Sequence, residues 1–316
     1  MTVRGEREAP PGQDLDVVVI GNAGVDTNVF LQKADIDFEV EGNFTENLDC
    51  ASQAGVYAAR SYAALGYQTA FIGHVGDDWA GHLVRDAFAH DGIDMSLLGT
   101  DPTGTARSVN LIYPDGRRKN FYDGKGHLNL SVDLDACRTL LARAKLVHVH
   151  LANWTRTLLP IARDLGLSVA CDLQDVVDPA DPYRQDFIRQ SDILFFSSVN
   201  HPDPAPLVNA FLKAGPARLA LCGLGAKGCA LGTRQGLRTF PPVSLPAPVV
   251  DTNGAGDSLA AGFLASHILQ GLPLEQAVLR GQLAARHACA QRASSSNQIT
   301  GRQLGQLASA FQPPEA

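Results

Sequence analysis

Asp251-Thr252-Asn253-Gly254-Ala255-Gly256-Asp257 is the stretch on which the prediction of the fold depends. Val249 and Val250 before it are typical of the end of a buried strand, and its glycines permit a sharp turn with an exposed backbone. The small-residue run 258–265 that follows has helical spacing. We therefore predict a strand that ends in a tight turn and leads directly into a helix.

A helix that begins with glycines is suited to binding an anion. Its first turn has unpaired N–H groups and partial positive charge, and glycine lets a phosphate approach the backbone closely. Asp257 would lie beside this positive end, which favours its ionised form and places a carboxylate where it can take a proton from a hydroxyl group. The pattern indicates phosphoryl transfer. The alternative is that Asp257 only caps the helix and the glycines only turn the chain.

Most of the chain alternates apolar runs of strand length with segments of helical spacing. The continuous apolar run Leu15–Ile20 predicts a central parallel strand that is covered on both faces. The alternation implies a three-layer α/β/α fold with a mostly parallel central sheet. Further strands of this sheet are expected at residues 69–72, 146–151, 168–172, 193–196 and 218–222, and helices at 52–65, 183–190, 205–213 and 274–291.

Three aspartates follow strand ends in this pattern. Asp26 comes after the first strand, Asp172 ends a middle strand, and Asp257 comes after the strand near Val250. Ligands of such sheets bind outside the carboxyl ends of the strands, so we expect the three side chains to share one site. The alternative is that they are ordinary turn residues.

Two pairs of segments alternate apolar and polar residues, as half-exposed strands do. They are residues 28–31 with 36–40, and 107–113 with 117–122 around a Pro114-Asp115-Gly116 turn. We expect a small β-sheet lid, with its strands in about 27–48 and 104–124, on a single domain that spans 14–312. Disordered tails are expected at 1–13 and 313–316.

The heptapeptide, with Ala261-Gly262 behind it, closely resembles the C-terminal signature of the ribokinase-like carbohydrate kinases, also called the phosphofructokinase-B family. The stretch 224–228 is similar to their nucleotide-side loop, and 73–81 to an internal Gly-x-Val-Gly-x-Asp-x-x-Gly segment. A dinucleotide-binding motif at 223–228 is disfavoured, because a strand rather than a helix is expected after it. The resemblance covers nearly the whole chain. It implies an ATP-dependent kinase that phosphorylates a hydroxymethyl group of a sugar or sugar-like compound.

The resemblance also implies roles for single residues. Asp257 would be the general base, and the backbone of Gly254, Ala255 and Gly256 would hold the developing charge. ATP and Mg²⁺ are the implied cofactors, a monovalent cation is left open, and no residue is assigned as a metal ligand. The acceptor would be bound by Gly24, Asp26, Asn28, Ser52, Gln53, Tyr57, Arg107 and Asn110, and the nucleotide by Ser197, Asn200, Gly225, Lys227, Gly228, Thr252 and Asn253.

The sequence departs from the family pattern at two places that matter for function. Ser52-Gln53 and Tyr57 stand where relatives have a Gly-Gly pair and an Asn, and Ser197-Ser198-Val199-Asn200 stands where many have Asn-x-x-Glu. A nucleoside kinase, with Tyr57 as a shelf for the base, and a weakly catalytic ligand-binding relative therefore remain alternatives. Arg107 would grip an anionic acceptor, or it is an edge charge that discourages strand pairing.

Composition restricts the partners and the location. The net charge of −7 with scattered Lys and Arg gives no basic face for nucleic acid. No apolar run is long enough to span a bilayer and the N-terminus has no apolar signal core, so we expect a cytoplasmic protein without a membrane partner. The half-apolar lid predicts a homodimer through the lid.

His148 and His150 share one face of a strand, where packing is favoured over metal binding.

Overall fold

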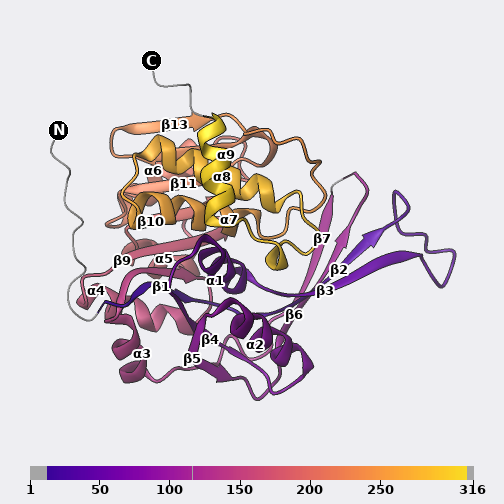
Figure 1. Ribbon diagram of the computed structural model, residues 1–316, viewed down its shortest axis with the longest axis horizontal. Coiled ribbons are helices and arrows are strands. Elements are labelled where there is room, and N and C mark those ends of the chain that lie inside the picture. Colours follow the sequence, from indigo (N-terminus) through magenta and orange to yellow (C-terminus); the bar gives the residue numbers. More distant parts are fainter. Residues whose placement is uncertain (1–12, 116, 312–316) are drawn as a thin grey trace.

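The computed structural model describes residues 13–115 and 117–311. The predicted tails at 1–13 and 313–316 lie outside the described residues except for Gln13, and so does Gly116 of the predicted turn. Figure 1 shows a three-layer α/β/α body from which a smaller sheet projects to one side. No helix among the described residues is both long and apolar enough to cross a membrane.

The central sheet has nine strands in the order β13-β12-β11-β10-β9-β8-β1-β4-β5. All neighbours from β5 to β11 are parallel, and at the other edge β12 pairs antiparallel with both β11 and β13. The predicted mostly parallel sheet is therefore confirmed. The strands are β1 Leu15–Ile20, β4 Thr69–Val75, β5 Asp94–Thr100, β8 Ala144–His150, β9 Ser168–Asp175, β10 Ile193–Ser197, β11 Leu219–Gly223, β12 Cys229–Thr233 and β13 Gly236–Phe240.

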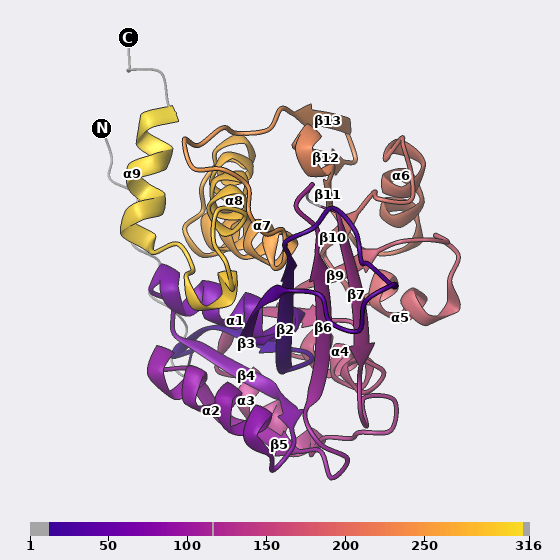
Figure 2. The same ribbon diagram turned by 90° about the vertical axis from the view of Figure 1, so that its right-hand side faces the viewer.

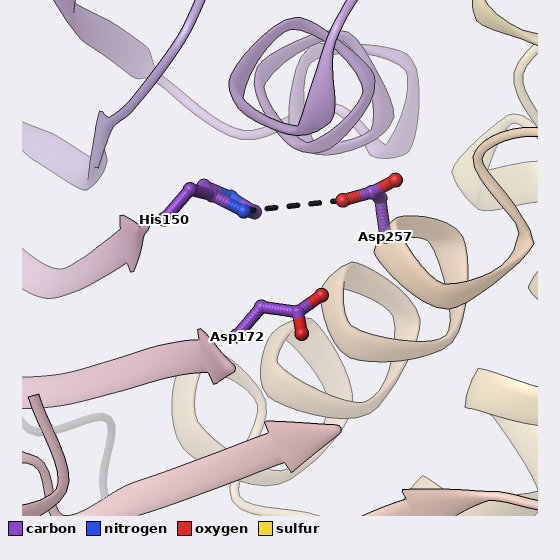
Figure 3. A group of neighbouring side chains, drawn as sticks. All are labelled: His150, Asp172 and Asp257. Carbon is purple, nitrogen blue, oxygen red and sulfur yellow. Dashed lines mark ion pairs between the residues drawn. The ribbon is translucent and has the colours of Figure 1, made fainter. Parts of the chain in front are cut away.

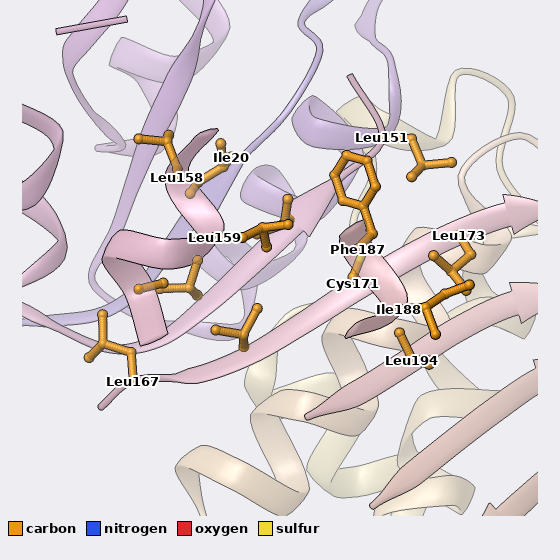
Figure 4. Packing of buried hydrophobic residues seen from close by; sticks show 14 of the residues in the cluster. Ile20, Leu151, Leu158, Leu159, Leu167, Cys171, Leu173, Phe187, Ile188 and Leu194 are labelled. Carbon is orange, nitrogen blue, oxygen red and sulfur yellow. The ribbon is translucent and has the colours of Figure 1, made fainter. Parts of the chain in front are cut away.

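Helices cover both faces of this sheet, and β1 shows why its sequence is continuously apolar. Val17 and Val19 pack into the hydrophobic cluster under α1, α2, α7 and α8, whereas Val18 and Ile20 pack into the cluster under α3 to α6. Figure 4 shows part of the second cluster. The helices are α1 Ala54–Leu65, α2 Trp79–Asp91, α3 Leu134–Leu141, α4 Leu159–Asp164, α5 Pro182–Gln190, α6 Ala205–Ala214, α7 Ala255–Leu264, α8 Leu274–Ala288 and α9 Gly301–Phe311, with short helical turns at Trp154–Leu158, Gly225–Lys227, Ala265–Leu269 and Ser294–Ser296.

The projecting sheet, which we call the lid, has four strands in the order β3-β2-β6-β7 (Figure 2). They are β2 Gly24–Leu31, β3 Thr45–Ser52, β6 Ala106–Ile112 and β7 Arg118–Asp123. The prediction of a strand at 36–40 was wrong. There the carboxylate of Asp37 accepts the amide of Glu39 at 3.0 Å, and the backbone of Asp37 exchanges hydrogen bonds with the side chain of Asn43, so the segment closes a loop. The partner of β2 is instead β3, which pairs with it along its whole length.

The prediction of a buried strand end at Val249 and Val250 was also wrong. Both residues lie in the loop between β13 and α7, and the side chain of Val249 is 57% exposed. The amides of Val250 and Asp251 donate to the carbonyl of Cys289 just after α8, at 2.8 and 3.3 Å, and not to a neighbouring strand. The turn before α7 is therefore held by a helix end, and Asp257 does not follow a strand.

Candidate active site

The turn that begins α7 requires glycine at position 254. Gly254 has φ of +73°, in the left-handed region that side chains disfavour. A Cβ atom there would also lie 2.4 Å from the ring of Tyr57 on α1. Gly256, by contrast, has open space where a Cβ would be. The two glycines thus differ: the first shapes the turn, and the second keeps the helix start accessible.

Some of the amides at this turn are available to a ligand. The amide of Asn253 donates to the carboxylate of Asp251 at 2.9 Å, and that of Ala255 donates to the carbonyl of Thr252 at 3.3 Å. The amides of Gly256 and Asp257 have no backbone acceptor within the described part of the chain. Of the amides predicted to bind an anion at 253–256, those of Asn253 and Ala255 are therefore already paired, and those of Gly256 and Asp257 have no backbone acceptor in the described chain.

Asp257 lies in the first turn of α7 and its side chain is 13% exposed. Figure 3 shows that it faces His150 at the end of β8 and Asp172 on β9. The Nδ1 atom of His150 is 3.9 Å from Oδ1 of Asp257, and one donor atom from each of the three residues lies within 4.8 Å of the other two.

The groups around Asp257 contradict the prediction that its carboxyl group is ionised. Burial raises the pKa of Asp257 well above its usual value, and the charges of Asp172 and Asp26 add to this, against the opposing effect of Arg118. The prediction that the helix start favours the ionised form is therefore wrong for the ligand-free protein. The desolvation and the two carboxylates outweigh the partial charge of the helix.

The predicted acceptor residues meet where the lid joins the body. Asp26 lies inside β2, not in a loop before it, and is buried. It accepts hydrogen bonds from the side chain of Gln53 at 3.1 Å and from the hydroxyl of Tyr57 at 3.3 Å. Burial raises the pKa of Asp26, and the Tyr57 hydrogen bond opposes this rise. Ser52 is buried beside them, and its hydroxyl has no partner in the described chain.

Tyr57 does not form an open shelf. Its side chain is 4% exposed, and its ring lies against the Gly254 turn. Little of the ring surface is therefore left for an aromatic base to stack on.

A row of amide side chains connects the lid to the turn. Asn28 accepts from Asn110 at 2.9 Å and from Asn253 at 3.1 Å, and Asn110 accepts from Asn120 at 2.8 Å. Gly24, which we predicted to bind the acceptor, also has a structural role: a Cβ there would lie 2.1 Å from the carbonyl oxygen of Ala106. Glycine at this position lets β2 and β6 pair closely.

Two arginines of the lid are placed differently from the prediction. Arg107 lies on β6, between β2 and β7, so its interpretation as an edge charge is wrong. Its guanidinium lies 4.8 Å from the Trp79 ring centroid and donates to the Thr27 hydroxyl. Arg118, which was not assigned to the site from the sequence, donates to the side chain of Asn253.

The predicted nucleotide residues lie at the ends of neighbouring strands. Ser197 ends β10 opposite Gly223 of β11, and the 225–227 turn leads to Gly228, where a Cβ would meet the carbonyl of Phe240 at 2.2 Å. Lys227 lies in that turn. The side chain of Asn200 makes a long 3.4 Å hydrogen bond to the carbonyl of Val176, and Thr252 is exposed.

Of three residues that lie near Asp257, only Asp172 was expected at the site from the sequence. His150, Asp172 and Arg118 come from β8, β9 and β7, and only the fold brings them to α7. The two histidines do share a strand face as predicted, with ring centroids 4.4 Å apart, and His148 pairs with the hydroxyl of Tyr62. Asp172 was predicted to end a strand, but β9 continues to Asp175, so the residue lies inside the strand.

A cleft of about 330 Å³ lies between the lid and the 249–252 loop. Its walls are apolar at Phe30, Tyr113 and Val249, and Arg118 and Arg292 add positive charge.

Known proteins resemble this chain along most of its length. It is 33% identical over 292 residues to an acarbose 7(IV)-phosphotransferase of Actinoplanes sp., covering 91% of this chain and 96% of that protein. It is 28% identical over 312 residues to a 5-dehydro-2-deoxygluconokinase of Lacticaseibacillus casei, covering 90% and 92% of the two chains. The solved structure of a microbiome-derived acarbose kinase superposes with a TM-score of 0.85 at 29% identity, covering 93% of this chain and 99% of that one.

More distant structures confirm the fold. The structure of Arabidopsis thaliana ribokinase complexed with ribose and ATP has a TM-score of 0.78 at 20% identity, and covers 93% of this chain and 98% of that one. The sequence profile of the pfkB family carbohydrate kinases matches residues 53–300, which include the lid strands β6 and β7, the Asp257 turn and the 225–228 loop. The chain therefore belongs to the pfkB family of carbohydrate kinases and is a sugar kinase with a ribokinase-like fold.

Proposed function

We propose that this protein transfers the γ-phosphoryl group of ATP to a hydroxymethyl group of a sugar or sugar-like acceptor, with Asp257 as the general base. The observation that carries the proposal is the arrangement at the start of α7. A carboxylate there lies one residue from a glycine with open space, next to two amides without backbone acceptors in the described chain. The first turn of α7 thus offers both a carboxylate that can accept a proton and backbone amides that can bind an anion.

The helix start fits the phosphate end of ATP. The amides of Gly256 and Asp257 point from the positive end of α7, and Arg118 adds a full positive charge beside Asn253. Bound ATP would supply the phosphoryl group. Donors fixed in advance stabilise the charge that develops during transfer, and each contributes on the order of a hundredfold to a thousandfold in rate. The 225–228 turn and Ser197 would support the rest of the nucleotide.

The raised pKa of Asp257 in the ligand-free protein is compatible with a base role. The transition state of phosphoryl transfer is loose, so the base needs position more than strength. Positive charge brought close to Asp257 would favour its ionised form, since an opposite charge lowers a carboxylate pKa. Asp26 would hold acceptor hydroxyls, and its oxygens are already oriented by Gln53 and Tyr57.

The geometry favours a sugar over a nucleoside as the acceptor, because the ring of Tyr57 is buried. We further propose that the acceptor is larger than one sugar ring. The cleft between the lid and the 249–252 loop would hold its remote part, with Phe30 and Tyr113 as apolar walls. Two similar proteins carry names that refer to acarbose, which supports an extended acceptor.

Mg²⁺ would arrive with the nucleotide, because carboxylate, phosphate and water oxygens are the ligands it prefers. Asn200 is a candidate for a water-bridged contact, and we assign no direct protein ligand.

A cytoplasmic location and a homodimer formed through the lid are part of the same proposal. The lid loop exposes Phe38 and Phe44, each 88% exposed, and a second subunit would cover them.

A coupled ADP-release assay over monosaccharides, oligosaccharides, sugar phosphates and nucleosides tests the proposal. Asp257→Asn should lower kcat by roughly a hundredfold or more on the acceptor that is found. Asp86→Asn is a matched control, because Asp86 is exposed on α2. Turnover by Asp257→Asn at the wild-type rate would exclude Asp257 as the base, and turnover of nucleosides alone would exclude a sugar acceptor.

A further inference from the structure

His150 is buried without a partner at the centre of the candidate site. Its side chain is 1% exposed, and neither ring nitrogen has a hydrogen-bond partner in the described chain. Buried polar groups are nearly always paired, so such a side chain needs an explanation. Figure 3 shows that the ring faces the carboxylates of Asp257 and Asp172 across a short gap.

The group around this gap consists of two acidic side chains and one imidazole, and the Arg118 guanidinium that acts on Asp257 is hydrogen-bonded to Asn253. Burial raises the pKa of Asp172 to about 6, and Asp257 is shifted in the same direction. Neither ring nitrogen of His150 has a hydrogen-bond partner in the described chain, so the neutral ring has a lone pair free to coordinate an ion. An imidazole lone pair beside two carboxylates is a donor set for a dication.

We propose that His150, Asp172 and Asp257 bind a first-row transition-metal dication such as Zn²⁺. One donor atom from each residue lies within 4.8 Å of the others. A point therefore exists within about 2.8 Å of all three atoms, and typical Zn–N and Zn–O bonds of about 2.0–2.2 Å need each donor to close by well under 1 Å. Small rotations of the two aspartates are enough for this.

The protein scaffold holds two of the three donors firmly. His150 and Asp172 are direct partners in the parallel pairing of β8 with β9. His148 stacks on His150 and is itself fixed by Tyr62, at 3.2 Å from its hydroxyl. The third donor, Asp257, is the most accessible of the three and faces the side from which an ion would enter.

The donor set separates this site from the Mg²⁺ that accompanies a nucleotide. Imidazole suits Zn²⁺, Co²⁺ and related ions, whereas Mg²⁺ prefers an all-oxygen shell with several waters. Three protein ligands leave a fourth position open for water.

The functional consequence rests on the proposed role of Asp257 as the base. An Asp257 carboxylate that coordinates a dication cannot accept the proton of the acceptor hydroxyl. The ion should therefore inhibit the kinase, and it should compete with the acceptor for Asp257. Zn²⁺ bound at this site would therefore lower the rate of phosphorylation.

Metal binding can be measured on the full-length, metal-free protein without ATP or acceptor. Titration with Co²⁺ should give a visible absorption band that saturates at one ion per chain and is abolished by Zn²⁺. Calorimetry with Zn²⁺ should give the same stoichiometry. His150→Gln and Asp172→Asn should each weaken binding at least about tenfold, as loss of one ligand from a small donor set requires.

His82→Gln is the matched control, because His82 also lies beside a carboxylate, 3.4 Å from Asp77, but on the surface. Its affinity for Co²⁺ should equal that of the wild type. Circular dichroism and a thermal melt of each variant show whether it is folded. Wild-type affinity in both folded His150→Gln and Asp172→Asn would overturn the proposal, and so would the absence of a Co²⁺ band at millimolar ion.

The two proposals can fail separately. A saturable Co²⁺ site that depends on His150, in a protein that phosphorylates no sugar, would support the metal site and contradict the kinase mechanism. Phosphorylation that requires Asp257 and that Zn²⁺ inhibits equally in wild type and His150→Gln would support the mechanism and contradict the metal site.

Discussion

Replacing Gly254 by alanine should destabilise the protein, and the structure gives the magnitude. The left-handed backbone at φ of +73° costs a residue with a Cβ about 1–2 kcal/mol. The added Cβ would lie 2.4 Å from the Tyr57 ring, and overpacking of this kind costs typically about 1–3 kcal/mol. The free energy of unfolding should therefore fall by about 2–5 kcal/mol. For a chain of this length the melting temperature should fall by roughly 3–8 °C.

Gly256→Ala is the matched substitution two residues later. Gly256 lies inside α7 and has open space, so alanine should leave the free energy of unfolding unchanged or raise it by up to about 1 kcal/mol. The new methyl group would, however, stand at the proposed phosphate seat. Gly256→Ala should thus lose kinase activity with full stability.

Urea denaturation followed by circular dichroism, together with the ADP-release assay, separates the two effects. The reasoning is refuted if Gly254→Ala melts at the wild-type temperature, since both the backbone conformation and the Tyr57 contact would then be wrong. Equal destabilisation by the two substitutions would show that a Cβ atom is not tolerated at position 256 either.

Three other predictions concern the lid and its junction with the body. Because burial raises the pKa of Asp26 in the folded state, its neutral form adds stability that is present below the unfolded pKa and lost as the pH rises through the folded pKa. Asp26→Asn should therefore gain stability relative to wild type as the pH rises above the unfolded pKa of about 3.9. Thermal melts measure this, and a constant difference would contradict it. Arg118→Ala should lower kcat/KM by about tenfold or more with little change in melting temperature. The control Lys119→Ala, at an exposed position on the same strand, should keep the wild-type kcat/KM. Equal losses of kcat/KM in the two variants would argue against the contact of Arg118 with Asn253. Sedimentation at micromolar concentration should show a dimer that Phe44→Glu converts to a monomer, and a wild-type monomer would rule out the lid interface.

The chain order of strands and helices could largely be predicted, because each element is set by local periodicity. The run Leu15–Ile20 predicts a strand with both faces covered, and its residues do pack alternately into two clusters. The same method failed at 36–40, where alternation coincides with a loop closed by Asp37 and Asn43. It also failed at Val249 and Val250, where apolar residues face a cleft. In both places hydrogen bonds to residues outside the segment decided the conformation.

The sequence by itself determined the turn at 251–257, because glycines at fixed positions and an acid in the first helical turn are local requirements of that backbone. The family resemblance and the position of Asp257 in the first turn of a helix follow from it, and the parallel sheet follows from the alternation of strands and helices. Only the tertiary structure decided what surrounds Asp257. His150, Asp172 and Arg118 are distant in sequence, and they come together because the end of β8, the later part of β9 and the beginning of β7 lie near the start of α7. Burial among these groups sets the pKa of Asp257, since desolvation and neighbouring charges depend on the packed fold and not on the residues next to it in the chain.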